Sequence, residues 1–516
     1  MLVQELLERS AAATPGREAL VCSGRRMTFA EIDAEANRLA HALRRGGIRY
    51  GDRVAVLIDN SPETVISIWA ALKADATFLV INPTTKSAKI SYILENCRAS
   101  ALITHSARWR NAAASVASTP SLKTVICAGK ATPAIRDGVP AGVSFLEWPE
   151  ALEGMPETRP ERKSIDIDLA ALIYTSGSTG NPKGVMLTHQ NIVSASTSIT
   201  TYLENRADDI IMNVLPLSFD YGLYQILMAA QFGGKVILEK SFTYPYQIIN
   251  LIKEEKATGF PIVPTISAIL LQMKDLGSED FSGLRYISNT AAALPVSHIR
   301  GLQKIFPSTT IYSMYGLTEC KRVSYLPPDQ LDRRPDSVGK GMPNEQVYLV
   351  DEKGGIITEA GVIGELVVRG ANVMKGYWEL PKETSERLRP GIHPWEQSLY
   401  TGDLFRMDEE GYLYFVSRKD DIIKSRGEKV SPKEVANAIY AIEDVVEAAV
   451  IGVPDDVLGE AVKAFVVLKE GSKVTEQDIL AHCSKNLEDF MMPKIVELRK
   501  SLPKTTTGKI TTKNLQ

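Results

Sequence analysis

The stretch Tyr174-Thr-Ser-Gly-Ser-Thr-Gly-Asn-Pro-Lys183-Gly184 contains three glycines, four Ser/Thr hydroxyls and one lysine. It follows the apolar run Leu169-Ala-Ala-Leu-Ile173, which predicts a buried strand. Glycine lets the backbone come close to a ligand, and turned amides together with hydroxyls can surround an anion. Lys183 adds a point positive charge that suits phosphate. The stretch therefore predicts a phosphate-binding loop.

This loop differs from the Walker form, in which Gly-x-x-x-x-Gly-Lys-[Ser/Thr] opens directly into a helix. Here the lysine lies beyond Gly180 and is followed by Gly184-Val-Met-Leu-Thr188, which predicts an extended segment. A flexible surface loop is the alternative interpretation. The ordered string is too specific for that alternative to be favoured.

Six further blocks follow in order along the chain. They are Tyr315-Gly-Leu-Thr-Glu319, Val362-Ile-Gly-Glu-Leu366, Gly376-Tyr-Trp378, Tyr400-Thr-Gly-Asp403, Ser417-Arg-Lys-Asp-Asp-Ile-Ile-Lys424 and Leu502-Pro-Lys-Thr-Thr-Thr-Gly-Lys509. With the loop, they resemble the adenylate-forming (AMP-binding) superfamily of acyl-CoA synthetases, aryl-CoA ligases, luciferases and the adenylation domains of nonribosomal peptide synthesis. The resemblance covers essentially the whole chain.

Composition excludes several classes of protein. A chain of 516 residues is too long for one ordinary core, so two or more domains are expected. The net charge of −3, with both signs interspersed, gives no basic stripe for nucleic acid. No apolar run approaches the length of a membrane span, and the N-terminus lacks the basic and apolar regions of a signal peptide. Five scattered cysteines predict free thiols in a reducing compartment, the cytoplasm.

The pattern of apolar runs predicts an α/β fold. Short runs such as Arg53–Ile58 and Thr77–Ile81 alternate with helical segments such as Pro62–Lys73, and a second series runs from Asp209 to Ser313. From Asn344 to Tyr414 short strands with Gly/Asp turns predict a small barrel or distorted sheet. We expect a large N-terminal domain, 1–418, of two layered α/β sheet subdomains plus a small β-barrel-like one. A small α+β C-terminal domain, 419–516, follows, and the resemblance implies that it is mobile.

The chemistry that the resemblance implies begins with ATP and Mg²⁺. A carboxylate attacks the α-phosphate poorly because both are anionic, so charge must be screened and the attack aligned. Glu319 matches the family's magnesium ligand, and Thr318 would reach the α-phosphate. Lys509 matches the lysine that bridges the substrate carboxylate and the α-phosphate. The remaining nucleotide contacts would be Thr175, Ser176, Gly177, Ser178, Thr179, Gly180 and Lys183 at the β- and γ-phosphates, Tyr315 over adenine, and Asp403 with Arg418 at the ribose.

A second half-reaction transfers the acyl group from AMP to a thiol, either of CoA or of a carrier protein's phosphopantetheine. In the family the C-terminal domain rotates, so that Lys509 leaves the site. Asp420 matches the hinge position, and Gly427 matches the glycine beside the pantetheine tunnel. No carrier-protein attachment segment follows Lys509, so any carrier would act in trans.

The acid substrate is left open by the sequence. In Leu215-Pro-Leu-Ser-Phe-Asp220, a Phe-Asp pair stands where many relatives have an aromatic–histidine pair, and amino-acid adenylation domains use Asp there to bind an ammonium. Asp220 could instead be a carboxylate on a helix N-terminus. Val80-Ile-Asn-Pro83 is more similar to acyl-CoA ligases, and Cys320-Lys321-Arg322 is unusual. By position Tyr224, Asn289, Met314 and Arg322 would line the acyl pocket, which favours a small or polar acid.

We therefore predict an AMP-forming acid–thiol ligase that acts on a small carboxylic acid. One rival is a free-standing amino-acid adenylation enzyme that loads a carrier protein. A second rival is an inactive nucleotide-binding paralogue, which intact Lys183, Glu319, Asp403 and Lys509 disfavour. His189 is predicted to be a structural hydrogen-bonder rather than a ligand or base.

Overall fold

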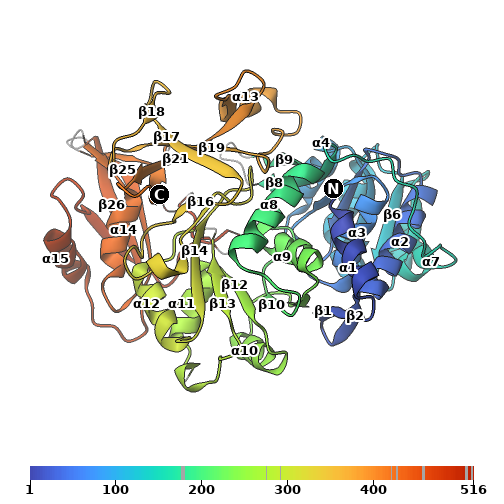
Figure 1. Cartoon of the computed structure of the whole chain (residues 1–516), viewed down its shortest axis with the longest axis horizontal. Coiled ribbons are helices and arrows are strands. Elements are labelled where there is room, and N and C mark those ends of the chain that lie inside the picture. Colours follow the sequence, from blue (N-terminus) through green and yellow to red (C-terminus); the bar gives the residue numbers. More distant parts are fainter. Residues whose placement is uncertain are drawn as a thin grey trace.

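The computed structural model describes residues 1–175, 181–274, 276–290, 292–419, 421–425, 428–455, 459–505, 509–512 and 515. Its elements form four sheets, three in the first 418 residues and one in the C-terminal part (Figure 1). This arrangement agrees with the predicted α/β class. Within the described residues, no helix is both long enough and apolar enough to cross a membrane.

A seven-stranded sheet carries the loop quoted above, in the order β7-β6-β5-β3-β4-β8-β9. Its strands are parallel except for β9, which turns back antiparallel to β8. The strands are β3 Arg53–Leu57, β4 Thr77–Val80, β5 Ala99–His105, β6 Thr124–Ala128, β7 Ser144–Glu147, β8 Leu169–Thr175 and β9 Lys183–Thr188. The helices between them are α3 Pro62–Lys73, α4 Ser87–Asn96, α5 Trp109–Ser118, α6 Pro133–Asp137 and α7 Trp148–Leu152, with the short 3₁₀ turn η1 Ser106–Arg108.

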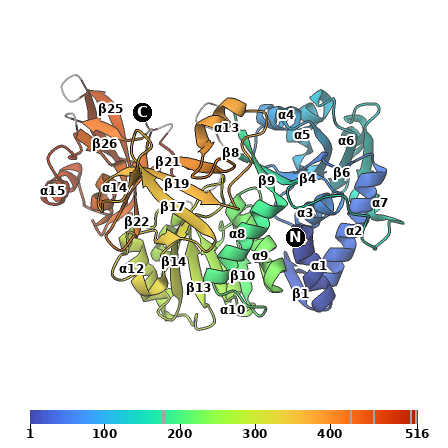
Figure 2. The same cartoon turned by 45° about the horizontal axis from the view of Figure 1, so that its top comes forward.

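The second sheet has nine strands in the order β16-β15-β14-β13-β12-β10-β11-β1-β2. Its strands are β1 Glu18–Cys22, β2 Arg25–Thr28, β10 Ile210–Asn213, β11 Lys235–Leu238, β12 Gly259–Ile262, β13 Tyr286–Asn289, β14 Thr310–Tyr315, β15 Ser324–Tyr325 and β16 Lys340–Gly341. The associated helices are α1 Gln4–Ala13, α2 Phe29–Arg45, α8 His189–Tyr202, α9 Asp220–Phe232, α10 Pro245–Glu254, α11 Pro264–Gln272 and α12 Val296–Ile305, with η2 Leu276–Ser278 and η3 Pro328–Gln330. Helices α8 and α9 lie between the two sheets (Figure 2), and one apolar core joins the facing sides of these sheets. A second apolar cluster lies under α4, α5 and α6 on the other face of the seven-stranded sheet.

The third sheet is antiparallel and lies over the junction of the first two. It is built from β17 Glu345–Val350, β18 Ile356–Ile357, β19 Gly364–Gly370, β20 Leu388–Pro390, β21 Gln397–Met407 and β22 Leu413–Arg418, with helix α13 Pro381–Arg387. The change to short antiparallel strands follows the expected change of texture in the sequence.

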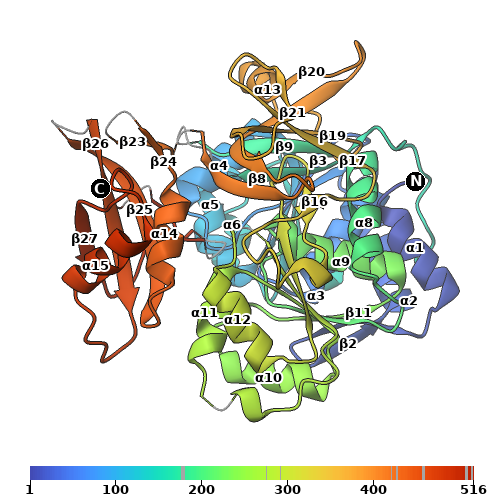
Figure 3. The same cartoon turned by 60° about the vertical axis from the view of Figure 1, so that its left-hand side comes forward.

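The C-terminal elements form a sheet with their own core and stand to one side of the molecule (Figure 3). They are β23 Ile423–Ser425, β24 Glu428–Val430, β25 Val445–Asp455, β26 Gly459–Leu468 and β27 Ile495–Leu498, with α14 Pro432–Tyr440 and α15 Glu476–Asn486. Ser431 caps α14 by accepting from the Glu434 amide, and Thr475 opens α15 with a complete capping box. Helix α14 faces the rest of the molecule (Figure 3).

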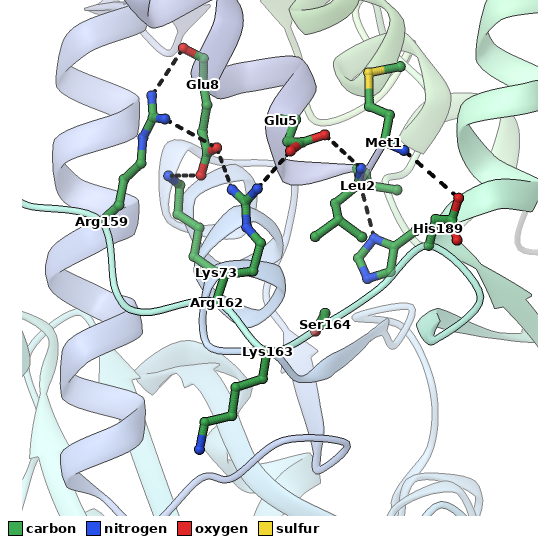
Figure 4. Close-up of polar contacts among 12 residues, drawn as sticks. Met1, Leu2, Glu5, Glu8, Lys73, Arg159, Arg162, Lys163, Ser164 and His189 are labelled. Atoms are coloured by element: carbon green, nitrogen blue, oxygen red, sulfur yellow. Dashed lines mark hydrogen bonds and ion pairs between the residues drawn. The ribbon is translucent and has the colours of Figure 1, made fainter.

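A buried polar network fixes the N-terminal helix (Figure 4). Lys73 Nζ lies 3.0 Å from Glu8 and 2.8 Å from Asp33, and Arg162 bonds both Glu5 and Glu8. The Val3 amide donates to His189 Nδ1 at 3.1 Å. Burial lowers the pKa of His189 to about 4, so this nitrogen stays an acceptor at neutral pH. The structure therefore gives His189 the structural hydrogen bond that the sequence predicts.

Candidate active site

The predicted phosphate loop joins two antiparallel strands at the edge of the seven-stranded sheet. Thr175 at the end of β8 lies opposite Lys183 at the start of β9, and both side chains are half-buried. The extended segment after the lysine is therefore confirmed. Ser176, Gly177, Ser178, Thr179 and Gly180 lie outside the described residues.

Segment 376–378, in the connection between β19 and α13, runs beside β9 and pairs with it through an antiparallel bridge between Val185 and Tyr377. The Trp378 amide donates to the Gly184 carbonyl at 2.7 Å, and the Met186 amide donates to the Gly376 carbonyl at 2.9 Å. Between them, Tyr377 donates its hydroxyl to Glu319 Oε1 at 2.7 Å. Lys183 Nζ lies 5.3 Å from the centre of the Tyr377 ring, which is within cation–π range. Tyr377 thus brings Lys183 and Glu319 to one place.

Tyr315 and Asp403 form a second part of the site. The Tyr315 hydroxyl donates to Asp403 Oδ2 at 2.5 Å, and the Tyr315 ring meets Phe405 edge-on with centroids 4.9 Å apart. Asp403 is only 8% exposed, and burial raises the pKa of its carboxyl. Arg418, directly opposite on β22, places Nε 3.7 Å from Asp403 Oδ1 and acts to lower that pKa. The carboxylate is buried and held by one hydroxyl and one cation.

Lys509 enters this site from the C-terminal domain. Its segment is held by an isolated bridge between Lys504 and Ile510 and by the Lys509 amide, which donates to Thr505 Oγ1 at 3.1 Å. Burial lowers the pKa of Lys509, and the charges that act on it come from Asp220, Arg418, Asp403 and Glu319. Three of these four are carboxylates, which favour the ammonium form. The residues whose charges act on Lys509 come from the nine-stranded sheet region (Asp220, Glu319) and from the third sheet (Asp403, Arg418).

The C-terminal domain docks beside the Tyr315 ring. Lys433, in the first turn of α14, donates to the Phe415 carbonyl at 3.3 Å and lies 5.3 Å from the centre of the Phe415 ring. Phe415 packs on Phe405 and Tyr315, with centroid distances of 5.4 and 6.4 Å. One aromatic cluster therefore includes the predicted adenine-site residue Tyr315 and contacts the C-terminal domain.

The predicted acyl pocket contains an ion pair that the sequence did not predict. Asp220 is the first residue of α9, and its Oδ2 lies 3.8 Å from Lys321 Nζ. Both residues are buried, and Lys321 also lies 4.5 Å from the Tyr224 ring centre. Asp220 therefore has a cation from its own chain as well as a helix N-terminus.

The other predicted pocket residues are also buried. Asn289 ends β13 and Met314 lies in β14, where its sulfur receives a hydrogen bond from Tyr202 at 3.0 Å. Arg322 follows directly after Lys321 and is 1% exposed. Thr318, which directly precedes Glu319 in the sequence, is half-buried. The hinge and tunnel candidates, Asp420 and Gly427, lie outside the described residues.

Sequence reasoning missed two residues of this site. Tyr377 lies inside a quoted block, but its hydrogen bond to Glu319 depends on the pairing of segment 376–378 with β9. Lys321 stood out as unusual, but its pairing with a residue about a hundred positions earlier left no local signal. The Phe-Asp pair and the Cys-Lys-Arg string were the available signals, and only the fold links them.

The Lys321 site makes stability depend on pH. Burial lowers the pKa of Lys321 to about 7, against the opposing effect of Asp220. Above this value the folded chain releases a proton that the unfolded chain keeps up to about pH 10.4. Stability from this group should therefore rise with pH across that window, by at most about 1.4 kcal/mol per pH unit. We expect the melting temperature of the wild type, relative to Lys321→Met, to rise between neutral pH and pH ~9. The exposed Lys353→Met is the control, and parallel curves for wild type and Lys321→Met would contradict this expectation.

Comparison with known proteins identifies the family. The chain matches the model of the AMP-binding enzyme over residues 7–378 and that of the AMP-binding enzyme C-terminal domain over residues 434–509. It is 32% identical to a long-chain-fatty-acid–CoA ligase of Bacillus subtilis, covering 99% of this chain and 94% of that protein. It is also 32% identical to a feruloyl-CoA synthase of Amycolatopsis sp, covering 97% and 96%.

A solved structure gives the same result. The anthranilate CoA ligase AuaEII in complex with anthranoyl-AMP superposes with a TM-score of 0.89 at 28% identity, covering 99% of this chain and 95% of that one. The family implies ATP as the activating substrate and CoA as the acyl acceptor. The chain therefore belongs to the AMP-binding enzyme family and is an adenylate-forming ligase of the acyl-CoA synthetase type.

Proposed function

We propose that this enzyme activates a small, polar carboxylic acid in two steps. The acid's carboxylate oxygen attacks the α-phosphorus of ATP, and pyrophosphate leaves as the acyl-AMP forms. The sulfur of CoA then attacks the acyl carbonyl carbon, and AMP leaves as the thioester forms. Both leaving groups are anions, so the site has to stabilise negative charge in each step.

The observation that supports this proposal is the buried Asp403 carboxylate, which accepts from the Tyr315 hydroxyl at 2.5 Å and has Arg418 Nε at 3.7 Å. Lys509 is the cation that would bridge the acid and the α-phosphate, and the charges of Asp220, Asp403 and Glu319 act on it. We assign the domain boundary to 418/419, and we assign to Lys509 the screening of charge during adenylation only.

The remaining roles follow from the contacts of Asp403, Tyr315, Glu319 and Lys183 described above. Asp403 and Arg418 would hold the ribose hydroxyls, Tyr315 would cover adenine, and Thr318 would reach the α-phosphate. Lys183 would contact the β- and γ-phosphates together with the loop that follows Thr175. A half-buried carboxylate near a phosphate site suits Mg²⁺, which takes one or two carboxylates plus phosphate oxygens, and Glu319 is that carboxylate. The bound ion would neutralise the charge of the departing pyrophosphate.

Asp220 argues for an acid without an α-amino group. Its carboxylate already faces Lys321 at 3.8 Å, so a substrate ammonium would have to compete with a built-in cation. This contact favours the acyl-CoA synthetase reading over the loading of an amino acid onto a carrier protein. The acceptor that we propose is accordingly CoA, and the carrier phosphopantetheine is an outcome of the test.

The test measures the two half-reactions separately. Exchange of labelled pyrophosphate into ATP reports acyl-AMP formation for matched pairs of amino acids and their des-amino analogues. Thioester formation is then followed with CoA and with a phosphopantetheinylated carrier protein. We expect exchange with des-amino acids, dependence on Mg²⁺ and transfer to CoA. Exchange confined to amino acids, with transfer only to the carrier, would replace this proposal by its rival.

A further inference from the structure

Two adjacent cationic residues are buried behind the candidate acyl site. Lys321 and Arg322 lie in the turn between β14 and β15, and they are 4% and 1% exposed. Lys321 has a left-handed backbone, with φ of 68°, a conformation that is strained for a non-glycine residue. The backbone of Lys321 also packs against Gly316, where a Cβ atom would meet the Lys321 carbonyl oxygen at 2.4 Å. The turn is therefore fixed by close packing.

The two cations differ in what surrounds them. Lys321 has Asp220 at 3.8 Å and the rings of Tyr224 and Tyr221 at 4.5 and 5.2 Å from their centres. Arg322 lies over the face of Tyr221, 5.1 Å from the ring centre, and its Nε and Nη1 have no hydrogen-bond partner among the described residues. Lys321 is thus neutralised within the chain, whereas the donors of Arg322 are only partly used.

Among the described residues, no carboxylate is paired with the Arg322 guanidinium. Asp220 faces Lys321. Glu345 is half-buried, and its Oε2 accepts from Asn372 Nδ2 at 2.6 Å, while its Oε1 has no partner among the described residues. The same Asn372 amide group donates to the Arg322 carbonyl at 3.2 Å. Burial raises the pKa of Glu345 well above its usual value, which favours the neutral acid. Arginine cannot release its proton in this way, so its positive charge remains.

A buried charge without a full set of hydrogen bonds destabilises the folded protein, so the surroundings of Arg322 indicate that a ligand completes them. Leaving a buried ion without a counter-ion typically costs several kcal/mol. Three further polar atoms around the same strands lack partners among the described residues, namely Asn289 Oδ1, Thr290 Oγ1 and Ser324 Oγ. Ser324 lies opposite Tyr315 on β15, and Asn289 lies beside Ser313 on the other side of β14. The polar atoms therefore flank one strand, β14, together with Arg322.

A chain of neighbouring residues connects Lys509 to Arg322. The charge of Asp220 acts on Lys509, and Asp220 pairs with Lys321. Arg322 follows Lys321 in the sequence and lies over the Tyr221 ring. An acid whose reacting carboxylate is at Lys509 would extend past Asp220 toward Arg322. Carboxylate oxygens are the acceptors that match free guanidinium donors, and the pairing strengthens as water is excluded.

We propose that the acid carries a second carboxylate and that Arg322 binds it, so that the enzyme is a dicarboxylate-specific ligase. This inference rests on the proposed function, because it names the acid that the adenylation site accepts. Arg322 would be a specificity-determining residue that holds the far end of the substrate, beside the Lys321–Asp220 pair. Only the carboxylate that reaches Lys509 becomes the acyl-AMP.

The experiment uses straight-chain dicarboxylic acids from malonic to suberic acid, each against its monomethyl ester. The ester keeps one carboxylate for activation and removes the second charge with almost the same shape. Pyrophosphate exchange by the full-length enzyme gives kcat/KM for each member. We expect one diacid to be preferred over its ester by about 30-fold or more, the loss expected when a buried guanidinium is left unpaired.

Variants then locate the preference. Arg322→Gln should bring the ratio of diacid to ester close to one while the KM for ATP stays within about twofold, and Arg322→Lys should restore part of the ratio. Arg300→Gln, an exposed arginine of α12, is the matched control and should keep the wild-type ratio. Esters or plain fatty acids preferred by the wild type at every length would overturn the inference and leave the proposed function intact. A preference unchanged in Arg322→Gln would overturn it as well, and no exchange with any acid would remove both proposals. If Arg322→Gln does not fold, the wild-type ratio and Arg322→Lys still decide.

Discussion

Replacing Lys509 by alanine should reduce acyl-AMP formation by about 10²–10³-fold, the scale of losing one group that stabilises charge in the transition state. The charges of Asp220, Asp403 and Glu319 act on its ammonium group, which we propose offsets the repulsion between the two anions. Pyrophosphate exchange measures this loss. Thioester formation from synthetic acyl-AMP and CoA should remain largely intact, because the charge is needed only while carboxylate meets α-phosphate.

A nearby lysine provides the control for this variant. Lys504 belongs to the same segment, and its Nζ pairs with Glu447 at 2.5 Å, outside the candidate site. Lys504→Ala should lose no more than the small value of a part-exposed ion pair, under about 1 kcal/mol of stability. Since burial lowers the pKa of Lys509, adenylation should also decline as pH rises through that lowered value, while transfer from acyl-AMP should not. Equal losses in both half-reactions would exclude a domain rotation that withdraws Lys509.

Replacing Asp403 by alanine should raise the KM for ATP by about 30-fold or more, because truncating one partner of a buried, charged hydrogen bond costs roughly 2–5 kcal/mol. Asp403 is 8% exposed and is held by Tyr315 and Arg418. Tyr315→Phe removes only the hydroxyl of that arrangement and keeps the ring. Its effect should be smaller, of the order of one neutral-to-charged hydrogen bond, about 1.5–3 kcal/mol at most.

The nucleotide itself can show whether Asp403 contacts the ribose. The wild type should discriminate strongly between ATP and 2′,3′-dideoxy-ATP, and Asp403→Ala should lose most of that discrimination. Tyr315→Phe should keep it in large part. A variant that weakens both nucleotides equally would assign Asp403 to the stability of β21 and β22 rather than to ribose binding.

Local pattern was enough to predict the regular part of the fold. The segments Arg53–Leu57, Pro62–Lys73 and Thr77–Val80 form a strand, a helix and a strand within one residue of the predicted ends. Each strand is buried on both faces, so its apolar run is continuous, and Ser61 with Pro62 marks the start of the helix. The hairpin β1–β2 behaves differently, because β1 pairs with β11 more than two hundred residues later. Its partner depends on tertiary packing, to which the local sequence gives no clue.

The same division applies to the site. The ordered blocks predicted which residues would be candidates, and the structure brings Tyr315, Asp403 and Arg418 into contact. The contacts between blocks were not predictable. Tyr377 contacts Glu319 because its segment pairs with β9, which lies far away in the sequence. Asp220 had two plausible interpretations from sequence, and its partner Lys321 became visible only when α9 and the turn after β14 were packed against each other.

The Phe415 ring lies between Tyr315 and Lys433, so one side chain is shared by the nucleotide site and the docked helix α14. Any free energy by which ATP favours the present docking of α14 must, by thermodynamic reciprocity, equal the free energy by which docking favours ATP. If Tyr315 covers adenine as proposed, the affinity for ATP is a property of two domains rather than of the large one alone.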